Sequence, residues 1–107
     1  MRFRVELSER AETDLKNYYL VAAKHAPETA TIWFNRFAAA LETLAVNPDR
    51  CTLAPENDLV DEAIYQFPFG KNLGRFRALF TIIGDRVVIL HIRRGTMDKA
   101  TKSELLG

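Results

Sequence analysis

The sequence predicts an α+β fold with the element order β-α-α-β-β-β, in which a helical hairpin packs on one face of a small twisted, mostly antiparallel sheet. Two observations carry this prediction. Apolar residues recur at helical spacing through most of residues 9–44. Two β-rich stretches, 75–83 and 86–94, are joined by Gly84-Asp85, which is a two-residue hairpin signal. A chain of 107 residues suits one domain spanning 1–107 and leaves no room for two.

The first expected elements are a strand and two helices. Residues 2–7 alternate apolar and charged side chains, which predicts a strand. Ser8 is expected to cap a helix over residues 9–25. Pro27 suits the first position of a second helix, which Asn47-Pro48 ends. Because the gap between the helices is short, we expect them to run antiparallel.

A loop and three strands are expected to follow. Residues 48–62 hold two prolines and five acidic residues, which indicates a surface loop. Residues 63–67 predict a strand that Pro68 ends. A loop over 69–74 then leads into a basic β-hairpin over 75–94.

The net charge of +1 conceals a separation of charge along the chain. Residues 42–62 contain six acidic residues and one basic residue, which gives −5, whereas residues 65–99 contain seven basic residues and two acidic ones, which gives +5. A basic segment of this kind attracts a polyanion or an acidic protein. The alternative is a basic face that simply meets solvent.

Composition excludes several classes of protein. Cys51 is the single cysteine, so the chain forms no internal disulfide, and no metal-ligand spacing surrounds it. We therefore expect no metal and no cofactor. The N-terminus lacks the apolar run of a signal peptide, and no stretch approaches the roughly 20 apolar residues of a membrane span. A cytoplasmic protein without membrane contact is expected.

The expected turn at Gly84-Asp85 sets a strand register. Opposite residues then have numbers that sum to 169, so that Arg77 faces Ile92 and Arg75 faces Arg94. This register brings Arg75, Arg77 and Arg94 together on one face, at the open end of the hairpin. Lys71 would add a fourth positive charge, and Arg93 would point toward the helices unless a bulge turned it out. The opposite face, expected against the helices, holds Phe76, Ala78, Phe80, Ile82, Val87, Ile89 and His91.

An arginine cluster of this kind suggests an anion-binding surface. Like charges placed directly opposite each other destabilise a sheet, and a bound phosphate or carboxylate would remove that penalty. Alternatively, the arginines pair with the acidic loop or meet water. Arginine can stabilise the charge of a scissile phosphate but is a poor base at neutral pH. His91 and His25 are expected to be a core residue and a helix cap, so the cluster has no evident group to transfer protons.

Several motifs resemble the RelE/ParE toxin superfamily. They are Leu7-Ser8-Glu9-Arg10-Ala11 at the start of a helix, Asn47-Pro48 after the second helix, the stretch Gly74-Arg75-Phe76-Arg77-Ala78-Leu79-Phe80, and Ile92-Arg93-Arg94-Gly95 at the end of the hairpin. The resemblance covers nearly the whole chain. It implies a plasmid-stabilisation or growth-inhibiting toxin that a small cognate antitoxin neutralises, with operator DNA bound only by the complex of toxin and antitoxin.

The resemblance leaves the target open. ParE-like members inhibit DNA gyrase, and RelE-like members are endoribonucleases that cleave mRNA on the ribosome. In the cleaving members the arginine corresponding to Arg77 stabilises the phosphate, with Arg75 and Lys71 nearby, and Arg93 and Gly95 match the Arg-x-Gly ending. Many members carry histidine at the position of Arg94 and arginine at the position of Met97, so this set of catalytic residues is incomplete.

Three hypotheses follow from these motifs. The long helical hairpin favours a ParE-like inhibitor of a macromolecular target such as gyrase. A ribosome-dependent endoribonuclease and an inactive module that keeps only antitoxin binding are the alternatives. The residues expected to bind an anion or the target are Lys71, Arg75, Arg77, Arg93 and Arg94. If the protein cleaves RNA, Arg77, Arg75 and Lys71 are the expected catalytic residues.

Overall fold

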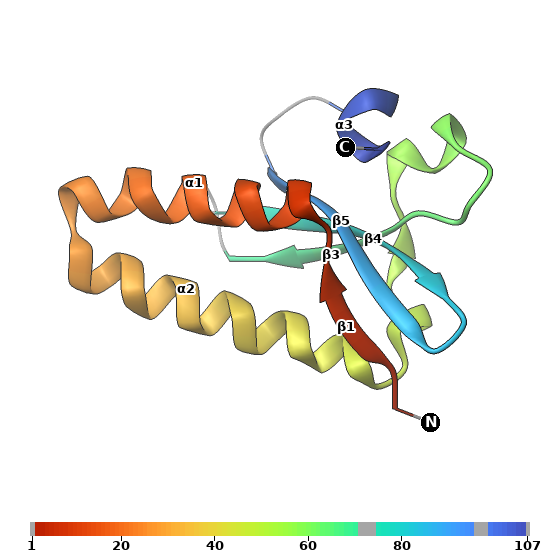
Figure 1. Cartoon of the computed structure of the whole chain (residues 1–107), viewed down its shortest axis with the longest axis horizontal. Helices are drawn as coiled ribbons and strands as arrows, with labels where there is room; N and C mark the ends of the chain where they lie inside the picture. The colour runs from red at the N-terminus through yellow and green to blue at the C-terminus, as the bar shows by residue number, and fades with distance from the viewer. Residues whose placement is uncertain (1, 71–74, 96–98, 107) are drawn as a thin grey trace.

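The computed structural model describes residues 2–70, 75–95 and 99–106. Its elements in chain order are β1 (Arg4–Leu7), α1 (Glu9–His25), α2 (Pro27–Glu42), three short 3₁₀ turns (Thr43–Ala45, Pro48–Arg50 and Pro55–Leu59), β2 (Thr52–Leu53, before the third turn), β3 (Tyr65–Phe69), β4 (Phe76–Ile83), β5 (Arg86–Arg94) and α3 (Lys102–Leu106). Figure 1 shows the two long helices side by side and extending past the strands at one end.

The strands form one sheet in the order β1-β5-β4-β3-β2. β1 pairs with β5 in parallel, and the other neighbours are antiparallel. Gly84 has a φ of +59° whereas Asp85 keeps a negative φ, which is the pattern of a type II′ turn. Glycine adopts that conformation without the steric penalty of a side chain. The turn therefore lies where the sequence predicted it.

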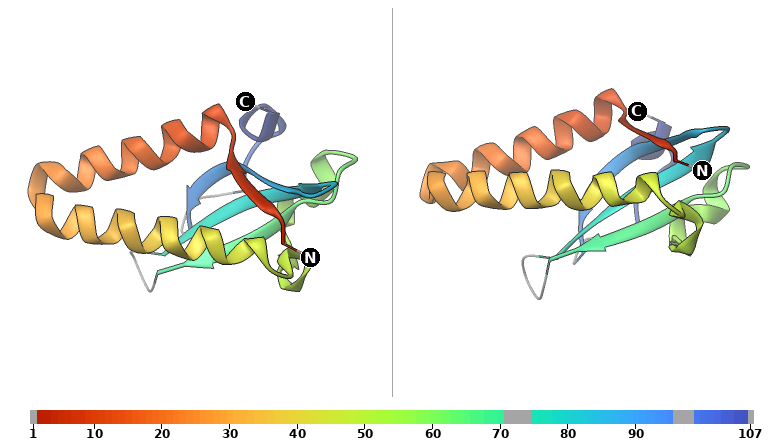
Figure 2. Two further views of the ribbon diagram at one scale, coloured as in Figure 1. Left: turned by 60° about the horizontal axis from the view of Figure 1, so that its bottom comes forward. Right: turned by 90° about the horizontal axis from the view of Figure 1, so that it is seen from below.

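Both long helices lie across one face of the sheet (Figure 2). Ser8 caps α1 by accepting a hydrogen bond from the Ala11 N–H at 3.1 Å, and Pro27 begins α2. The core between the helices and the sheet is rich in aromatic residues, and the rings of Trp33, Phe37 and Phe76 contact one another. The predicted α+β fold and its helical hairpin are confirmed.

The other face of the sheet has a smaller cover. Residues 54–64 and α3 lie against it and bury a second apolar cluster of Ala54, Ile64, Leu79, Ala100 and Leu105. α3 begins with reciprocal bonds in which the Thr101 N–H donates to Glu104 and the Glu104 N–H donates to the Thr101 hydroxyl. This is a capping box, which satisfies two backbone N–H groups at the start of the helix.

Some boundaries differ from the prediction. β1 begins at Arg4 rather than at residue 2, and β3 continues through Pro68 to Phe69. Pro68 pairs with β4 on one side, whereas β2 pairs only with Tyr65 and Gln66. Pro68 therefore lies at an edge of the sheet, where the missing N–H of proline is tolerated. β2 and α3 were not predicted. Neither is long enough to show a periodic pattern.

The predicted register of the hairpin is correct only near the turn. Ile83 faces Arg86 and Thr81 faces Val88 as expected, but a β-bulge opposite Leu79 and Phe80 adds one residue to β5. Beyond the bulge, Leu79 faces His91 rather than Leu90. A bulge of one residue reverses the face of each later side chain, because strand side chains alternate.

The bulge overturns the predicted pairing of the arginines. Arg77 faces Arg93, not Ile92, and Arg94 faces Phe76, not Arg75. Ile92 takes the place on the helix-covered face that was assigned to His91. No helix in the described part of the chain is long and apolar enough to cross a membrane.

Candidate functional site

The four predicted contact residues that the structure describes do not form one cluster. Arg77 lies on the face opposite the helical hairpin, the bulge places Arg93 on the same face, and both side chains are largely buried. Arg75 and Arg94 are exposed near the same end of the sheet. Lys71 lies outside the described residues. The prediction that Arg75, Arg77 and Arg94 converge on one face is therefore wrong.

Arg77 is neutralised by a buried carboxylate. Its Nη1 and Nη2 donate to the two oxygens of Glu56 at 2.7 and 2.5 Å, and Glu56 is fully buried. Glu56 also accepts a hydrogen bond from the Ala100 N–H at 2.7 Å. Burial raises the pKa of Glu56, but the bonds from Arg77 and Ala100 outweigh it and lower the pKa to about 2. Glu56 thus joins three separate segments of the chain.

Arg93 belongs to a second buried network. Its Nη1 donates to Glu104 of α3 at 2.7 Å and lies 3.3 Å from His91 Nε2. The other ring nitrogen of His91, Nδ1, lies 2.5 Å from Asp14 Oδ2. His91 is 3% exposed and Arg93 is 7% exposed, so this network lies beneath α3.

Asp14 reaches this network from α1, along the edge of β5 that β1 leaves unpaired. Its carboxylate accepts from the Ile92 N–H at 3.0 Å and from Arg10 Nε at 2.9 Å. Burial raises the pKa of Asp14, but the bonds from His91, Ile92 and Arg10 outweigh it, so the pKa lies below its usual value. Asp14 therefore accepts a backbone hydrogen bond from β5 in the part of the strand that lies beyond β1.

Arg75 lines a hollow of about 500 Å³ on the face opposite the helical hairpin, together with Thr52, Pro55, Gln66, Pro68, Arg77, Gly95 and Lys99. A Cβ at Gly95 would lie 3.2 Å from Arg75 Cγ, so the arginine stem lies directly on this glycine. Lys99 is paired with Asp58 at 2.6 Å. Within the described residues Arg75 has no carboxylate partner, and it is the cation here that an outside anion can reach.

Arg94 lies at a different hollow. Its guanidinium is 5.7 Å from the centre of the Phe76 ring. The hollow, of about 760 Å³, lies where the helical hairpin extends past the strands, and it is lined by Tyr18, Val21, Ala22, His25, Ala26, Thr29, Ala30, Trp33, Phe76 and Arg94. Its floor is aromatic and its rim carries a positive charge. We call this hollow the hairpin groove.

Several of the residues that could carry phosphate chemistry are paired within the chain. Arg77 and Arg93, which could stabilise a phosphate, are both paired with carboxylates of their own chain. His91 is enclosed between Asp14, Arg93 and Glu104. Among the described residues, no three His, Cys, Asp or Glu side chains are placed to hold a metal ion. The cations of the hairpin that remain open to a partner are Arg75 and Arg94.

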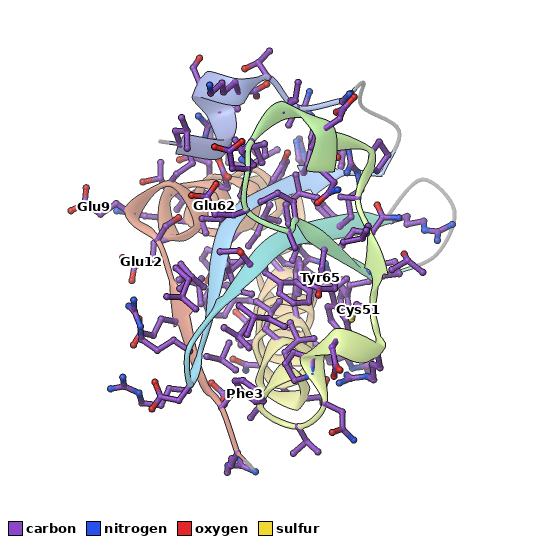
Figure 3. The ribbon with its side chains drawn as sticks, turned by 90° about the vertical axis from the view of Figure 1, so that its right-hand side faces the viewer. Phe3, Glu9, Glu12, Cys51, Glu62 and Tyr65 are labelled. Atoms are coloured by element: carbon purple, nitrogen blue, oxygen red, sulfur yellow. The ribbon has the colours of Figure 1, made fainter. Side chains whose placement is uncertain are left out.

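The sequence analysis did not identify the carboxylates that pair with Arg77 and Arg93. Glu56 lies in the acidic loop, which had been considered as a partner for the arginines, although nothing in the pattern singled it out. Thr101-Lys102-Ser103-Glu104 is a capping-box sequence, a signal from which α3 could have been predicted. Figure 3 shows Glu9 and Glu12 projecting outward from the start of α1.

Comparisons with known proteins identify the family. The family model of the ParE toxin of the type II toxin–antitoxin system parDE matches residues 5–99. A chain from the chromosomal ParDE toxin–antitoxin system of P. aeruginosa has a TM-score of 0.71 at 19% identity, covering 87% of this chain and 96% of that chain. A chain from the toxin–antitoxin complex RelBE2 of Mycobacterium tuberculosis has a TM-score of 0.54 at 19% identity, covering 91% and 95%. No curated protein sequence matches.

At 19% identity, the two solved structures establish similarity of fold alone. The family model establishes more, because it spans most of the sequence and both long helices together with the β4–β5 hairpin. The resemblance inferred from the motifs is thereby confirmed, and it lies on the ParE side of the superfamily. The chain belongs to the ParE family, the toxins of type II toxin–antitoxin systems.

Proposed function

We propose that this toxin inhibits a macromolecular target such as DNA gyrase by binding to it, without cleaving RNA. The internal neutralisation of Arg77 and Arg93 carries the proposal. Arg77 would have to break its pair with the buried Glu56 before it could bind a scissile phosphate. The cost of leaving a buried carboxylate unpaired is several kcal/mol. A binding inhibitor needs no such rearrangement.

The target is proposed to contact the open end of the hairpin. Arg75 and Arg94 are exposed there, on opposite sides of the sheet end. Both can donate bidentate bonds to carboxylates of a protein target. Electrostatic attraction at such a site raises the rate of association and selects for an acidic surface.

The proposed second partner is a cognate antitoxin. The hairpin groove offers an aromatic floor of Tyr18, Trp33 and Phe76 beside Arg94. This combination suits a partner segment with apolar side chains next to a carboxylate. Such a segment would cover Arg94 and compete with the target for it.

Two assays with the purified toxin test the mechanism. In the first, the toxin is added to gyrase and plasmid supercoiling is measured. In the second, it is added to ribosomes translating a defined mRNA, and the RNA is checked for breaks. We expect loss of supercoiling and intact mRNA. Cleavage of mRNA in the ribosomal A site would overturn the proposal in favour of an endoribonuclease, and the absence of both effects would favour an inactive module.

Charge variants test the contact residues. Arg75→Ala and Arg94→Ala should each weaken growth inhibition on induction of the toxin. Arg36→Ala is the matched control, because Arg36 is an exposed arginine of α2 away from both hollows. The circular dichroism spectrum of each variant should match that of the unmodified toxin. Equal growth inhibition by all three variants would contradict the assignment of the contact residues.

A further inference from the structure

The side of the helical hairpin that faces away from the sheet carries exposed apolar residues. The sheet lies on one side of α1 and α2, and their other side faces outward (Figure 2). A hollow of about 600 Å³ lies between the two helices, and Leu15, Tyr19, Leu20 and Phe34 are among the residues that line it. Leu20 is 46% exposed, and Ile32 of α2 is 53% exposed. Large apolar side chains exposed beside a hollow indicate an interaction surface.

Contacts between the two helices show which of their residues lie at the same height. The Tyr19 hydroxyl lies 3.4 Å from Thr31 Oγ1, and the centre of the Tyr19 ring lies 5.5 Å from that of Phe34. Tyr19 is therefore level with the residues between Thr31 and Phe34. Because the helices run antiparallel, Leu20 is level with Ile32.

Two opposite charges lie about one turn nearer the connection of the helices. Lys24 follows Leu20 by four residues and Glu28 precedes Ile32 by four, so these two are again level, and both are exposed. Neither has an ion partner among the described residues. We call the surface formed by Leu20, Lys24, Glu28 and Ile32 the outer face.

The outer face is complementary to itself under a two-fold rotation. A two-fold axis parallel to the helices, above the hollow between them, would place α1 of a second copy over α2 at the same height. Leu20 of each copy would then meet Ile32 of the other. Lys24 of each copy would meet Glu28 of the other. Each contact occurs twice, as in any isologous interface, and the four helices form an antiparallel bundle.

We propose that the outer face binds a second copy of this chain. The charges favour this occupant, because a face with one basic and one acidic group at matched heights fits its own rotated copy and repels a partner of uniform charge in part. The contact is confined to the end where the helices are joined. At the other end the helices diverge (Figure 1), and Glu9 and Glu42 would bring like charges together.

An interface of this extent is smaller than the roughly 800 Å² per partner of a standard complex, so we expect a dissociation constant on the order of 50 µM. The dimer leaves the other surfaces of the toxin open. None of the residues that line the hairpin groove lines the hollow of the outer face. Arg75 lies on the opposite face of the sheet. The inference therefore does not depend on the target of the toxin.

Sedimentation equilibrium of the full chain, between about 2 and about 500 µM, tests the dimer. We expect a monomer–dimer equilibrium. Lys24→Glu and Glu28→Lys should each raise the dissociation constant about tenfold, because each substitution places like charges opposite each other twice. An equimolar mixture of these two variants should restore the dimer, because each copy then presents the charge that the other lacks. Lys102→Glu is the matched control, since it changes the charge equally on exposed α3 and should leave dimerisation unchanged.

A further variant tests the apolar contact. Leu20→Ser should also raise the dissociation constant about tenfold, and its circular dichroism spectrum should match that of the unmodified chain because Leu20 is exposed in the monomer. A chain that stays monomeric at about 500 µM would overturn the proposal and leave the outer face to a different protein. A dimer that none of these variants weakens, or a mixture of Lys24→Glu and Glu28→Lys that stays monomeric, would overturn it as well.

Discussion

The two faces of the sheet are covered by different means. On one face, α1 and α2 bury an aromatic core in which Phe37 and Phe80 are fully inaccessible. On the other, a loop and a five-residue helix bury a smaller apolar cluster and rely on the ion pairs of Arg77 with Glu56 and of Arg93 with Glu104. Apolar burial responds weakly to pH, whereas buried ion pairs respond directly. The helix-covered face is therefore expected to contribute most of the free energy of unfolding, and the opposite face is expected to make that free energy depend on pH.

The largest expected effect comes from the helix-covered face. Phe37→Ala removes a ring that contacts Trp33, Phe69 and Phe76, and it should lower the free energy of unfolding by about 4 kcal/mol. Urea unfolding followed by circular dichroism at pH 7 and pH 5 measures it, and the loss should be the same at both. Ile32→Ala is the control, since Ile32 is 53% exposed, and it should cost less than about 0.5 kcal/mol. If Phe37→Ala lowered the free energy of unfolding by less than Glu56→Gln, the variant described next, the ranking of the two faces would be wrong.

The next effect comes from the buried ion pair on the opposite face. Glu56→Gln should lower the free energy of unfolding at pH 7 by about 3 kcal/mol, the linkage equivalent of a pKa lowered from 4.5 to about 2. Because the folded-state pKa is the lower one, this stability is present above pH 4.5 and is lost as the pH falls toward 2. The difference in the free energy of unfolding between Glu56→Gln and the unmodified protein, measured by urea unfolding, should therefore decrease as the pH falls over that range. A difference independent of pH would contradict the assignment.

Two further variants sharpen this result. Asp58→Asn breaks the exposed pair with Lys99 and should leave stability unchanged, because exposed ion pairs contribute little. Glu56→Leu combined with Arg77→Met replaces both charges by apolar groups and should recover most of the loss, as expected where the penalty is that of an unpaired buried charge.

The smallest expected effect separates stability from activity. Gly95→Ala places a methyl group 3.2 Å from Arg75 Cγ and 3.3 Å from the Arg75 carbonyl oxygen, so it should cost about 1 kcal/mol and displace the arginine. Growth inhibition should fall as it does for Arg75→Ala. Gly84→Ala is the matched control, because its φ of +59° also costs about 1 kcal/mol while no atom lies within 4 Å of the added group. Equal growth inhibition by the two variants would argue against a role for Arg75.

The sequence by itself determined the elements with a long periodic pattern. Helical spacing located α1 and α2, alternation located β4 and β5, and the Gly84-Asp85 pair located their turn. It also identified the helix-covered face of β4 correctly from Phe76 to Ile82. These features follow from local backbone geometry, which neighbouring residues specify.

Only the tertiary structure decided which arginines are open to a partner. One extra residue in β5, opposite Leu79 and Phe80, moved Arg94 to the helix-covered side and Arg93 to the other side. Bonds from Ser8 to the Leu90 carbonyl and from the Ile92 N–H to Asp14 accompany that bulge, and both partners lie about 80 positions away in the chain. A pattern of alternating residues carries no record of such distant contacts, because the inserted residue changes the pairing and leaves local spacing intact.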